Sequence, residues 1–339
     1  MENNPVAEAV WMVRGAWVTM ALRAGCRLGV FDRLVEPDTP AGLAEATACD
    51  EGAMARLVSA LATLGLLEER SDGTYVVTAV GSTLTETHPS GVRSLALMQS
   101  WLPNVAAWNH LEDAVRSGAG VYDRVNGVEY WQHLSSHPDQ LVEFNRSMSR
   151  RAEGQIAALV AALDLEGAET VVDVGGGRGA MLAGVLEAWP HLTGVIADRP
   201  EVAAEADEFF TEHGLGARAH GVGCDFFESV PEGADVYFLS NVLHDWDDED
   251  CRRILRTIRK AMSEGSKLVV VERVLGAPGR SAGQVRDLAL VDLHMLVAFG
   301  ARERTEAEYA ELLVASGFTG SELADTGTDW NVLEARPAT

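Results

Sequence analysis

The chain has 339 residues, 47% of them hydrophobic, and a formal net charge of −24 at pH 7, which fits two domains and argues against a nucleic-acid partner. Its four cysteines lie far apart without C-x-x-C spacing, so we expect reduced thiols in a cytoplasmic protein, with no disulfide framework and no zinc site. No apolar run reaches the roughly eighteen residues of a membrane span, so we expect no membrane partner.

Apolar residues recur at helical spacing from about Val6 to Leu34 and cover more than one face of the predicted helices. Such helices have to bury a second apolar face against another surface. One alternative is that their own domain encloses them. The other, which we favour, is that a second copy of the chain covers them in a homodimer.

The stretch from Thr39 to Gly81 predicts a winged helix, because Thr39 and Asp50 can cap two helices that a small hairpin follows. This pattern raises the hypothesis of a DNA-binding regulator. Between Thr39 and Glu69, however, there are five acidic residues and one basic residue, Arg56. A recognition helix needs Lys and Arg for phosphate contacts. We therefore interpret the winged helix as a packing and dimerisation module.

From Val92 to Met148 the chain is helical in pattern and rich in aromatic residues, most of which we expect to fill a core. A long helix from about Pro138 to Leu163 connects this segment to the rest. We therefore expect a helical and winged-helix domain at residues 1–150 and an α/β domain at residues 151–339.

Strands and helices alternate from Glu169 onward, which predicts a mainly parallel, doubly wound Rossmann-like sheet that binds ligands at the carboxyl ends of its strands. The first strand runs into the glycine-rich turn TVVDVGGGRGA, where missing side chains let a ligand approach the backbone. Gly175, Gly177 and Ala180 match the looser G-x-G-x-x-A dinucleotide fingerprint. The glycines alone therefore do not exclude a nicotinamide cofactor.

Acidic residues at three successive strand ends favour a different cofactor. Asp173 would repel a phosphate and suits an amine, and Asp198 is placed to bind a ribose diol. Asp225 and Phe226 follow a third apolar stretch and suit the amine and the ring face of adenine. A nucleoside that carries an amino acid and no phosphate fits all three positions, so we predict S-adenosylmethionine.

The strand ADVYFLSNVL leads to His244 and Asp245 at the same edge of the sheet, so we predict His244 as a general base. Glu272, which ends the next strand, and Glu303 would orient its imidazole and stabilise the cation. For Glu303 an alternative is open, because this residue could instead cap the helix that begins near Thr305.

The segments DVGGGRG, ADRP, CDFF, NVLHDWDDED, VVVERV and ARERTEAEY resemble the small-molecule O-methyltransferases of bacterial natural-product pathways, which are similar to plant caffeate and flavonoid O-methyltransferases. The resemblance covers nearly the whole chain. It implies a homodimer, a histidine base between two acids, and S-adenosylmethionine that leaves as S-adenosylhomocysteine without help from a metal.

The resemblance also implies a small aromatic substrate such as a polyketide phenol. The residues that it places around this substrate are Trp131, Phe144, Met148, His294, Met295 and Phe299. The chain departs from the plant pattern at Ser240, a cofactor-binding position where plant relatives have lysine, and at Arg199, where they have leucine.

Some proteins with this fold and cofactor catalyse hydroxylation, decarboxylation or a pericyclic step instead of methyl transfer, and they tend to lack the base. Because His244, Asp245, Glu272 and Glu303 occur together, we predict in-line methyl transfer to oxygen. A phenol with a pKa near 10 facing a histidine near 6.5 makes complete proton transfer uphill by about 5 kcal/mol. Deprotonation would then accompany methyl transfer, unless substituents acidify the phenol.

Overall fold

The structure is a computed structural model that describes residues 4–319 and 321–338. It divides into two compact units. Unit 1 comprises Met1–Ala106 and Trp131–Arg151, and unit 2 comprises Ala107–Tyr130 and Ala152–Thr339. In the described ranges, no helix is long and apolar enough to cross a membrane.

Unit 1 begins with the helices α1 (Pro5–Val13), α2 (Gly15–Arg27) and α3 (Val30–Arg33). Val30 and Phe31 lie in the core of this unit, so its own domain encloses the last part of the predicted apolar surface. The first part stays exposed in the single chain. Its exposed apolar residues are Val6, Val10, Trp11, Met12, Val13, Trp17 and Met20.

The predicted winged helix is confirmed. It consists of α4 (Pro40–Thr47), α5 (Glu51–Thr63) and the antiparallel hairpin of β1 (Leu67–Glu69) and β2 (Tyr75–Val77). The side chains of Thr39 and Asp50 accept hydrogen bonds from backbone amides in the first turns of the two helices, as expected of N-caps.

Short helices and one long helix follow the winged helix. They are α6 (Ala79–Ser82), α7 (Val92–Gln99), α8 (Leu102–Trp108), α9 (Leu111–Ser117), α10 (Tyr122–Asn126), α11 (Tyr130–Ser135) and α12 (Pro138–Ala161). The long connecting helix predicted near residues 138–163 corresponds to α12.

Unit 2 contains a seven-stranded sheet of order β10-β11-β7-β6-β3-β4-β5, in which β3 to β7 are parallel and the last hairpin is antiparallel. The strands are β3 (Thr170–Val174), β4 (Thr193–Asp198), β5 (Ala219–Gly223), β6 (Val236–Ser240), β7 (Lys267–Glu272), β10 (Glu322–Asp325) and β11 (Asn331–Ala335). The helices around it are α13 (Ala180–Ala188), α14 (Pro200–Glu212), α15 (Asp248–Ala261), α16 (Ala282–Phe299) and α17 (Glu306–Ala315). The predicted fold class is therefore confirmed.

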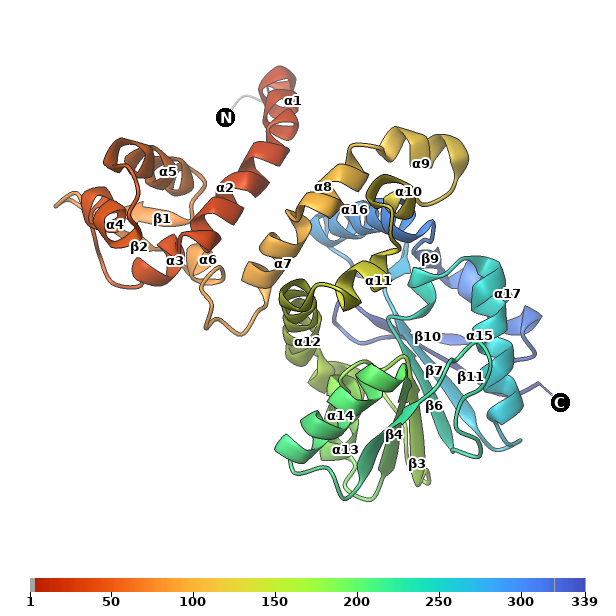
Figure 1. Cartoon of the computed structure of the whole chain (residues 1–339). Helices are drawn as coiled ribbons and strands as arrows, with labels where there is room; N and C mark the ends of the chain where they lie inside the picture. The colour runs from red at the N-terminus through yellow and green to blue at the C-terminus, as the bar shows by residue number, and fades with distance from the viewer. Residues whose placement is uncertain (1–3, 320, 339) are drawn as a thin grey trace. The chain divides into compact units, whose positions relative to one another are not determined.

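Each face of the sheet is covered by its own hydrophobic core, because successive side chains of a strand point to opposite faces. Tyr237 of β6 packs in a cluster with residues of α15 and α17, whereas its neighbour Phe238 packs in a cluster with residues of α12, α13 and α14. Figure 1 shows α13 and α14 on one side of the strands and α15 and α17 on the other.

This topology brings the ends of β3, β4, β6 and β7 to one edge of the sheet. A small parallel ladder of β8 (Val274–Leu275) and β9 (Arg304–Thr305) then holds residue 303 near the end of β7. The helix α16 was not foreseen in the sequence. Its signal was the capping box of Ser281 and Gln284 at its first turn.

Candidate active site

The glycine-rich turn after β3 requires glycine for two physical reasons. Gly175, Gly177 and Gly179 have φ angles of 71°, 58° and 89°, in the left-handed region. At Gly176 an added Cβ atom would lie 2.6 Å from the Asp173 carboxyl carbon, and at Gly175 it would lie 2.9 Å from a methyl carbon of Val242. The turn is therefore built around the carboxyl group of Asp173.

Asp173 is buried, with 1% of its surface exposed, and neither carboxyl oxygen has a hydrogen-bond partner among the described residues. Burial, and after it the negative charge of Asp198, raises the pKa of Asp173 to about 7. A buried acid without a partner is costly for a protein. Its position next to a glycine turn suits a ligand that brings a donor or a positive charge.

The other predicted cofactor residues lie along the same edge. Asp198 ends β4 and accepts hydrogen bonds from the backbone amides of Gly177 (3.0 Å) and Arg199 (2.7 Å), while burial raises its pKa. Asp225 is exposed after β5, and the partly buried Phe226 lies beside the glycine turn, 3.7 Å from the ideal Cβ position of Gly175. Ser240 is the last residue of β6, so that strand ends four residues before His244.

His244 lies on a single 3-10 turn, Leu243–Asp245, directly after this edge. Its Nδ1 atom is 2.8 Å from Oε2 of Glu272, and its Nε2 atom is 3.4 Å from Oδ1 of Asp245. The other oxygen of Glu272, Oε1, accepts hydrogen bonds from the amides of Val242 (3.1 Å) and Leu243 (2.8 Å). The fully buried Glu272 therefore holds both the imidazole and the backbone of its turn.

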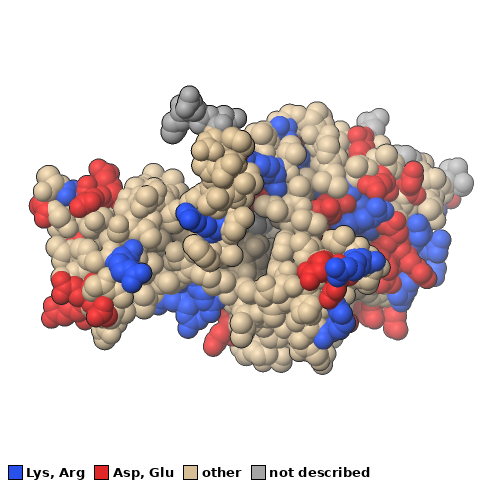
Figure 2. Space-filling model, turned by 90° about the horizontal axis from the view of Figure 1, so that it is seen from above, with Lys and Arg blue, Asp and Glu red and all other residues tan. Residues whose placement is uncertain are grey.

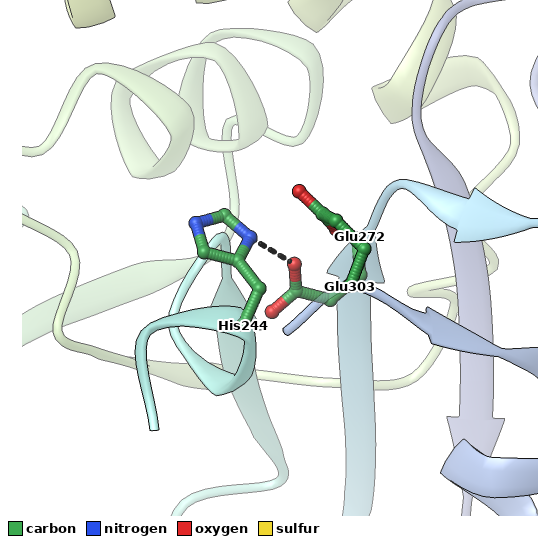
Figure 3. Close-up of side chains that lie close together, drawn as sticks. All are labelled: His244, Glu272 and Glu303. Atoms are coloured by element: carbon green, nitrogen blue, oxygen red, sulfur yellow. Dashed lines mark hydrogen bonds and ion pairs between the residues drawn. The ribbon is translucent and has the colours of Figure 1, made fainter. Parts of the chain in front are cut away.

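Glu303 is the third member of this cluster (Figure 3). Its carboxylate is buried and accepts no hydrogen bond from the described residues, and its nearest cation is Nη2 of Arg273 at 3.8 Å. One ligand atom each from His244, Glu272 and Glu303 lies within 4.8 Å of the others, a spacing that could also hold a cation. The alternative role for Glu303 is wrong, because Thr305 caps α17 and forms its capping box with Glu308.

The charges around His244 change its proton affinity. Burial lowers the pKa of His244, but the carboxylates of Glu272 and Asp245 outweigh burial and raise it to about 10. The ordinary value of 6.5 assumed from the sequence is therefore wrong. Burial raises the pKa of Asp245 to about 7 despite the neighbouring imidazole. These carboxylates therefore favour the imidazolium form of His244 in the ligand-free chain.

The residues predicted around the substrate fall into two groups. In unit 2, His294, Met295 and Phe299 lie on α16, which contacts the turn that bears His244. In unit 1, Trp131 and Phe144 make an edge-to-face ring contact at 5.5 Å, and Met148 is exposed. The joint action of the two groups stays a prediction.

Two residues that support the candidate site, Arg304 and Asn241, were not predicted from the sequence. Arg304, which is fully buried, binds backbone carbonyls on both sides of His244. Asn241 has a left-handed φ of 54°, and its side chain accepts a 2.6 Å hydrogen bond from the indole of Trp330. No sequence signal pointed to these contacts, except that Arg304 directly follows Glu303.

Comparison with known proteins gives two family matches. Residues 108–319 match the O-methyltransferase domain, and residues 11–87 match the O-methyltransferase dimerisation domain. The mitomycin biosynthesis 6-O-methyltransferase of Streptomyces lavendulae is 40% identical, over 90% of this chain and 87% of that protein. The aclacinomycin 10-hydroxylase of Streptomyces purpurascens is 33% identical, over 93% of this chain and 86% of that protein.

Two solved structures are similar over nearly their whole length. A mitomycin 7-O-methyltransferase gives a TM-score of 0.90 at 37% identity, over 99% of this chain and 100% of that chain. An O-methyltransferase from neocarzinostatin biosynthesis, in complex with S-adenosylmethionine and 2-hydroxy-5-methyl naphthoic acid, gives 0.82 at 31% identity, over 94% and 96%.

We predict that Asp173 makes the ligand-free protein less stable as the pH rises. Its pKa in the folded chain is about 7, above the ordinary value of 3.8, so its contribution to stability is complete below about pH 4 and is lost as the pH rises through about 7. Asp173→Asn should therefore raise the melting temperature at pH 8 and change it little at pH 4, as measured by thermal unfolding.

A control with the opposite sign is available at Asp235. Burial opposes ionisation there, but the amides of Glu169 and Thr170 bind the carboxylate and hold the pKa of Asp235 below its ordinary value. Asp235→Asn should lower the melting temperature at pH 8, and the loss should shrink as the pH falls. If both variants shift the melting temperature in the same direction at pH 8, the assignment for Asp173 is wrong.

Proposed function

Because the chain belongs to the family of S-adenosylmethionine-dependent O-methyltransferases, we propose that the pair of His244 and the buried Glu272 serves methyl transfer to a phenolic or enolic hydroxyl of a small aromatic natural product. The observation that carries this proposal is the 2.8 Å contact between the two side chains at the cofactor edge of the sheet. A bound S-adenosylmethionine supplies an electrophilic methyl group on a sulfonium ion.

The residues at the edge of the sheet fit this cofactor. Asp173 supplies a buried acceptor that has no hydrogen-bond partner among the described residues, which suits the amino group of the methionine part. Asp198 is placed for the ribose diol, and Asp225 with Phe226 for adenine. The turn at Gly175 and Gly177, together with Ser240, would contact the remainder of the molecule. A dinucleotide fits less well, because Asp173 lies where its pyrophosphate would approach the turn.

In this proposal His244 accepts the proton of the substrate hydroxyl, and Glu272 and Glu303 stabilise the imidazolium. Because the pKa of His244 is raised to about 10, close to that of a phenol, proton transfer to the neutral imidazole is nearly balanced instead of uphill by about 5 kcal/mol. Since the raised pKa favours the imidazolium at neutral pH, His244 first releases that proton to solvent, and the neutral imidazole then accepts the hydroxyl proton, so that a phenolate remains beside the imidazolium. Asp245, at Nε2, lies near enough to share in this charge.

We predict that the enzyme transfers labelled methyl from S-adenosylmethionine to polyketide-type phenols, as measured by mass spectrometry of the product. His244→Ala should slow turnover by about 10² to 10⁴ because base catalysis is lost. Cofactor affinity, measured by calorimetry with S-adenosylhomocysteine, should not change, because His244 lies outside the cofactor set. Raising the pH should partly rescue the variant, since solvent then ionises the phenol.

The competing function is cofactor-dependent chemistry without methyl transfer. The observation that favours this second candidate is the 33% identity to a hydroxylase. The presence of the complete set His244, Asp245, Glu272 and Glu303 supports methyl transfer. Consumption of an aromatic substrate without transfer of label, at a rate that His244→Ala leaves unchanged, would overturn our assignment in favour of the hydroxylase-like function.

We also propose that the chain works as a cytoplasmic homodimer that binds no nucleic acid. The matched dimerisation domain and the exposed apolar residues of α1 and α2 support the dimer. On the face drawn in Figure 2, the basic side chains of the described residues lie in separate small groups and form no continuous patch, which supports the absence of a nucleic-acid partner.

Light scattering should give the dimer mass at micromolar concentration, and a double variant, Trp11→Glu with Trp17→Glu, should give the monomer mass. The reason is that two charges would be buried without partners in the interface. Val314→Glu, at another exposed apolar position, is the matched control and should remain dimeric. A monomer mass for the wild-type chain would contradict the proposal.

For the substrate pocket we propose that His294 is a neutral hydrogen-bond donor. Its Nδ1 atom accepts a 3.2 Å hydrogen bond from the indole of Trp108, so Nε2 carries the ring proton. Burial lowers the pKa of His294 to about 4, which keeps the ring neutral. This donor suits a carbonyl or carboxylate oxygen near the hydroxyl that is methylated.

We predict that His294→Leu raises KM by about 3- to 100-fold for hydroxynaphthoates, through the loss of one hydrogen bond. A naphthol without the carboxylate is the control and should lose little. The measurement is steady-state kinetics on both compounds between pH 6 and 9, where the wild-type ring stays neutral. An equal rise in KM for both compounds would show that His294 only fills space.

A further inference from the structure

The turn that carries His244 is here called the histidine turn (residues 242–246). Its internal hydrogen bonds are too few to fix its conformation. It contains one 3-10 turn of three residues, and its N-cap residue, Val242, makes no side-chain cap hydrogen bond. A single turn of this kind makes few internal hydrogen bonds. The position of the imidazole is therefore set by the groups that bind the turn from outside.

Two buried charged side chains bind the histidine turn from opposite chemical sides. Glu272 accepts the amide hydrogens of Val242 and Leu243 at its start. Arg304 donates from Nη1 to the carbonyl of Leu243 and from Nη2 to the carbonyl of Trp246, each at 2.8 Å. Glu272 thus accepts hydrogen bonds from two amides of the turn, and Arg304 donates hydrogen bonds to carbonyl groups on both sides of His244.

Arg304 is itself held rigidly. Its side chain is fully buried, and Nε and Nη2 lie 3.1 and 2.9 Å from Oδ1 of Asp248, the first residue of α15. Its backbone belongs to β9, which pairs with β8 just after Glu272. Glu303 directly precedes Arg304 in the chain. One short segment therefore carries both an acid of the cluster and the side chain that binds the histidine turn.

We propose that Arg304 is a positioning residue for His244, which sets the place of the imidazole against Glu272, Glu303 and the methyl acceptor. The fork of a guanidinium suits this task, because it can bind two carbonyls and a carboxylate at once, whereas the ammonium of a lysine is a point charge. Displacement of a reacting group by about 1 Å can cost about 10²-fold in rate. The inference rests on the proposed function of His244.

Arg304→Lys tests the proposal because it keeps the charge and removes the fork. We expect kcat to fall by about 10- to 100-fold, while KM and the affinity for S-adenosylhomocysteine stay within about threefold. The loss should be smaller for a nitrophenol that is already ionised at the assay pH, because it does not need the base. A purely structural role would affect both substrates equally.

Two matched controls separate positioning from general stability. Arg302→Gln removes the other arginine bound to Asp248, at 2.9 Å, without touching the histidine turn. Arg259→Lys removes a guanidinium that likewise binds two backbone carbonyls, those of Gly317 and Ala338. Both variants should keep wild-type kcat. An equal fall of kcat in Arg259→Lys would overturn the proposal.

A second readout does not depend on activity. NMR titration of His244 in the ligand-free protein should show a lower pKa in Arg304→Lys, because the imidazole moves away from Glu272, and no change in the two controls. Asp248→Asn, which frees the guanidinium without removing it, should shift the same pKa less and carries the test if Arg304→Lys does not fold. Unchanged kcat and unchanged pKa in a folded variant would refute the positioning role. Failure of the wild-type chain to methylate any phenol would instead refute the proposed function and leave the NMR result standing.

Discussion

The site depends on the hydrogen bonds that the carboxylate of Glu272 accepts. A charge at the buried end of a central strand is tolerable only if several groups satisfy it, and here two amides and an imidazole do so. Those same contacts define where the histidine turn begins and which imidazole nitrogen faces the acid. The fold and the proposed base, His244, are therefore connected through one side chain, which the parallel pairing of β6 and β7 places at the same edge of the sheet.

Four acids of the site, Asp173, Asp198, Glu272 and Glu303, are buried. Asp173 and Glu303 are buried without hydrogen-bond partners among the described residues, and burial raises the pKa of both. Such an arrangement lowers the stability of the ligand-free chain. It also prepares an environment that favours positive charge, which both the amino group and the sulfonium of S-adenosylmethionine supply.

The sequence was most informative where local chemistry decides the structure. The glycine turn, the acids at strand ends, the N-caps of the winged helix and the alternation of strands and helices follow from short-range patterns. Arg304 and Asn241 were missed, because their partners lie far away in the chain. The pKa of His244 was wrong for the same reason, since its value depends on two carboxylates that only the folded sheet and turn bring together.

The order in which the chain is synthesised decides when the long-range contacts in and beside the histidine turn can form. Leu243 can form its hydrogen bond only after Arg304, 61 residues later, has been synthesised, and Asn241 only after Trp330, 89 residues later. By contrast, Asp173 and Asp198 come together from adjacent parallel strands within a short stretch of chain. A nascent chain on the ribosome can therefore bring together the acids proposed to bind the cofactor well before it completes the surroundings of the proposed base.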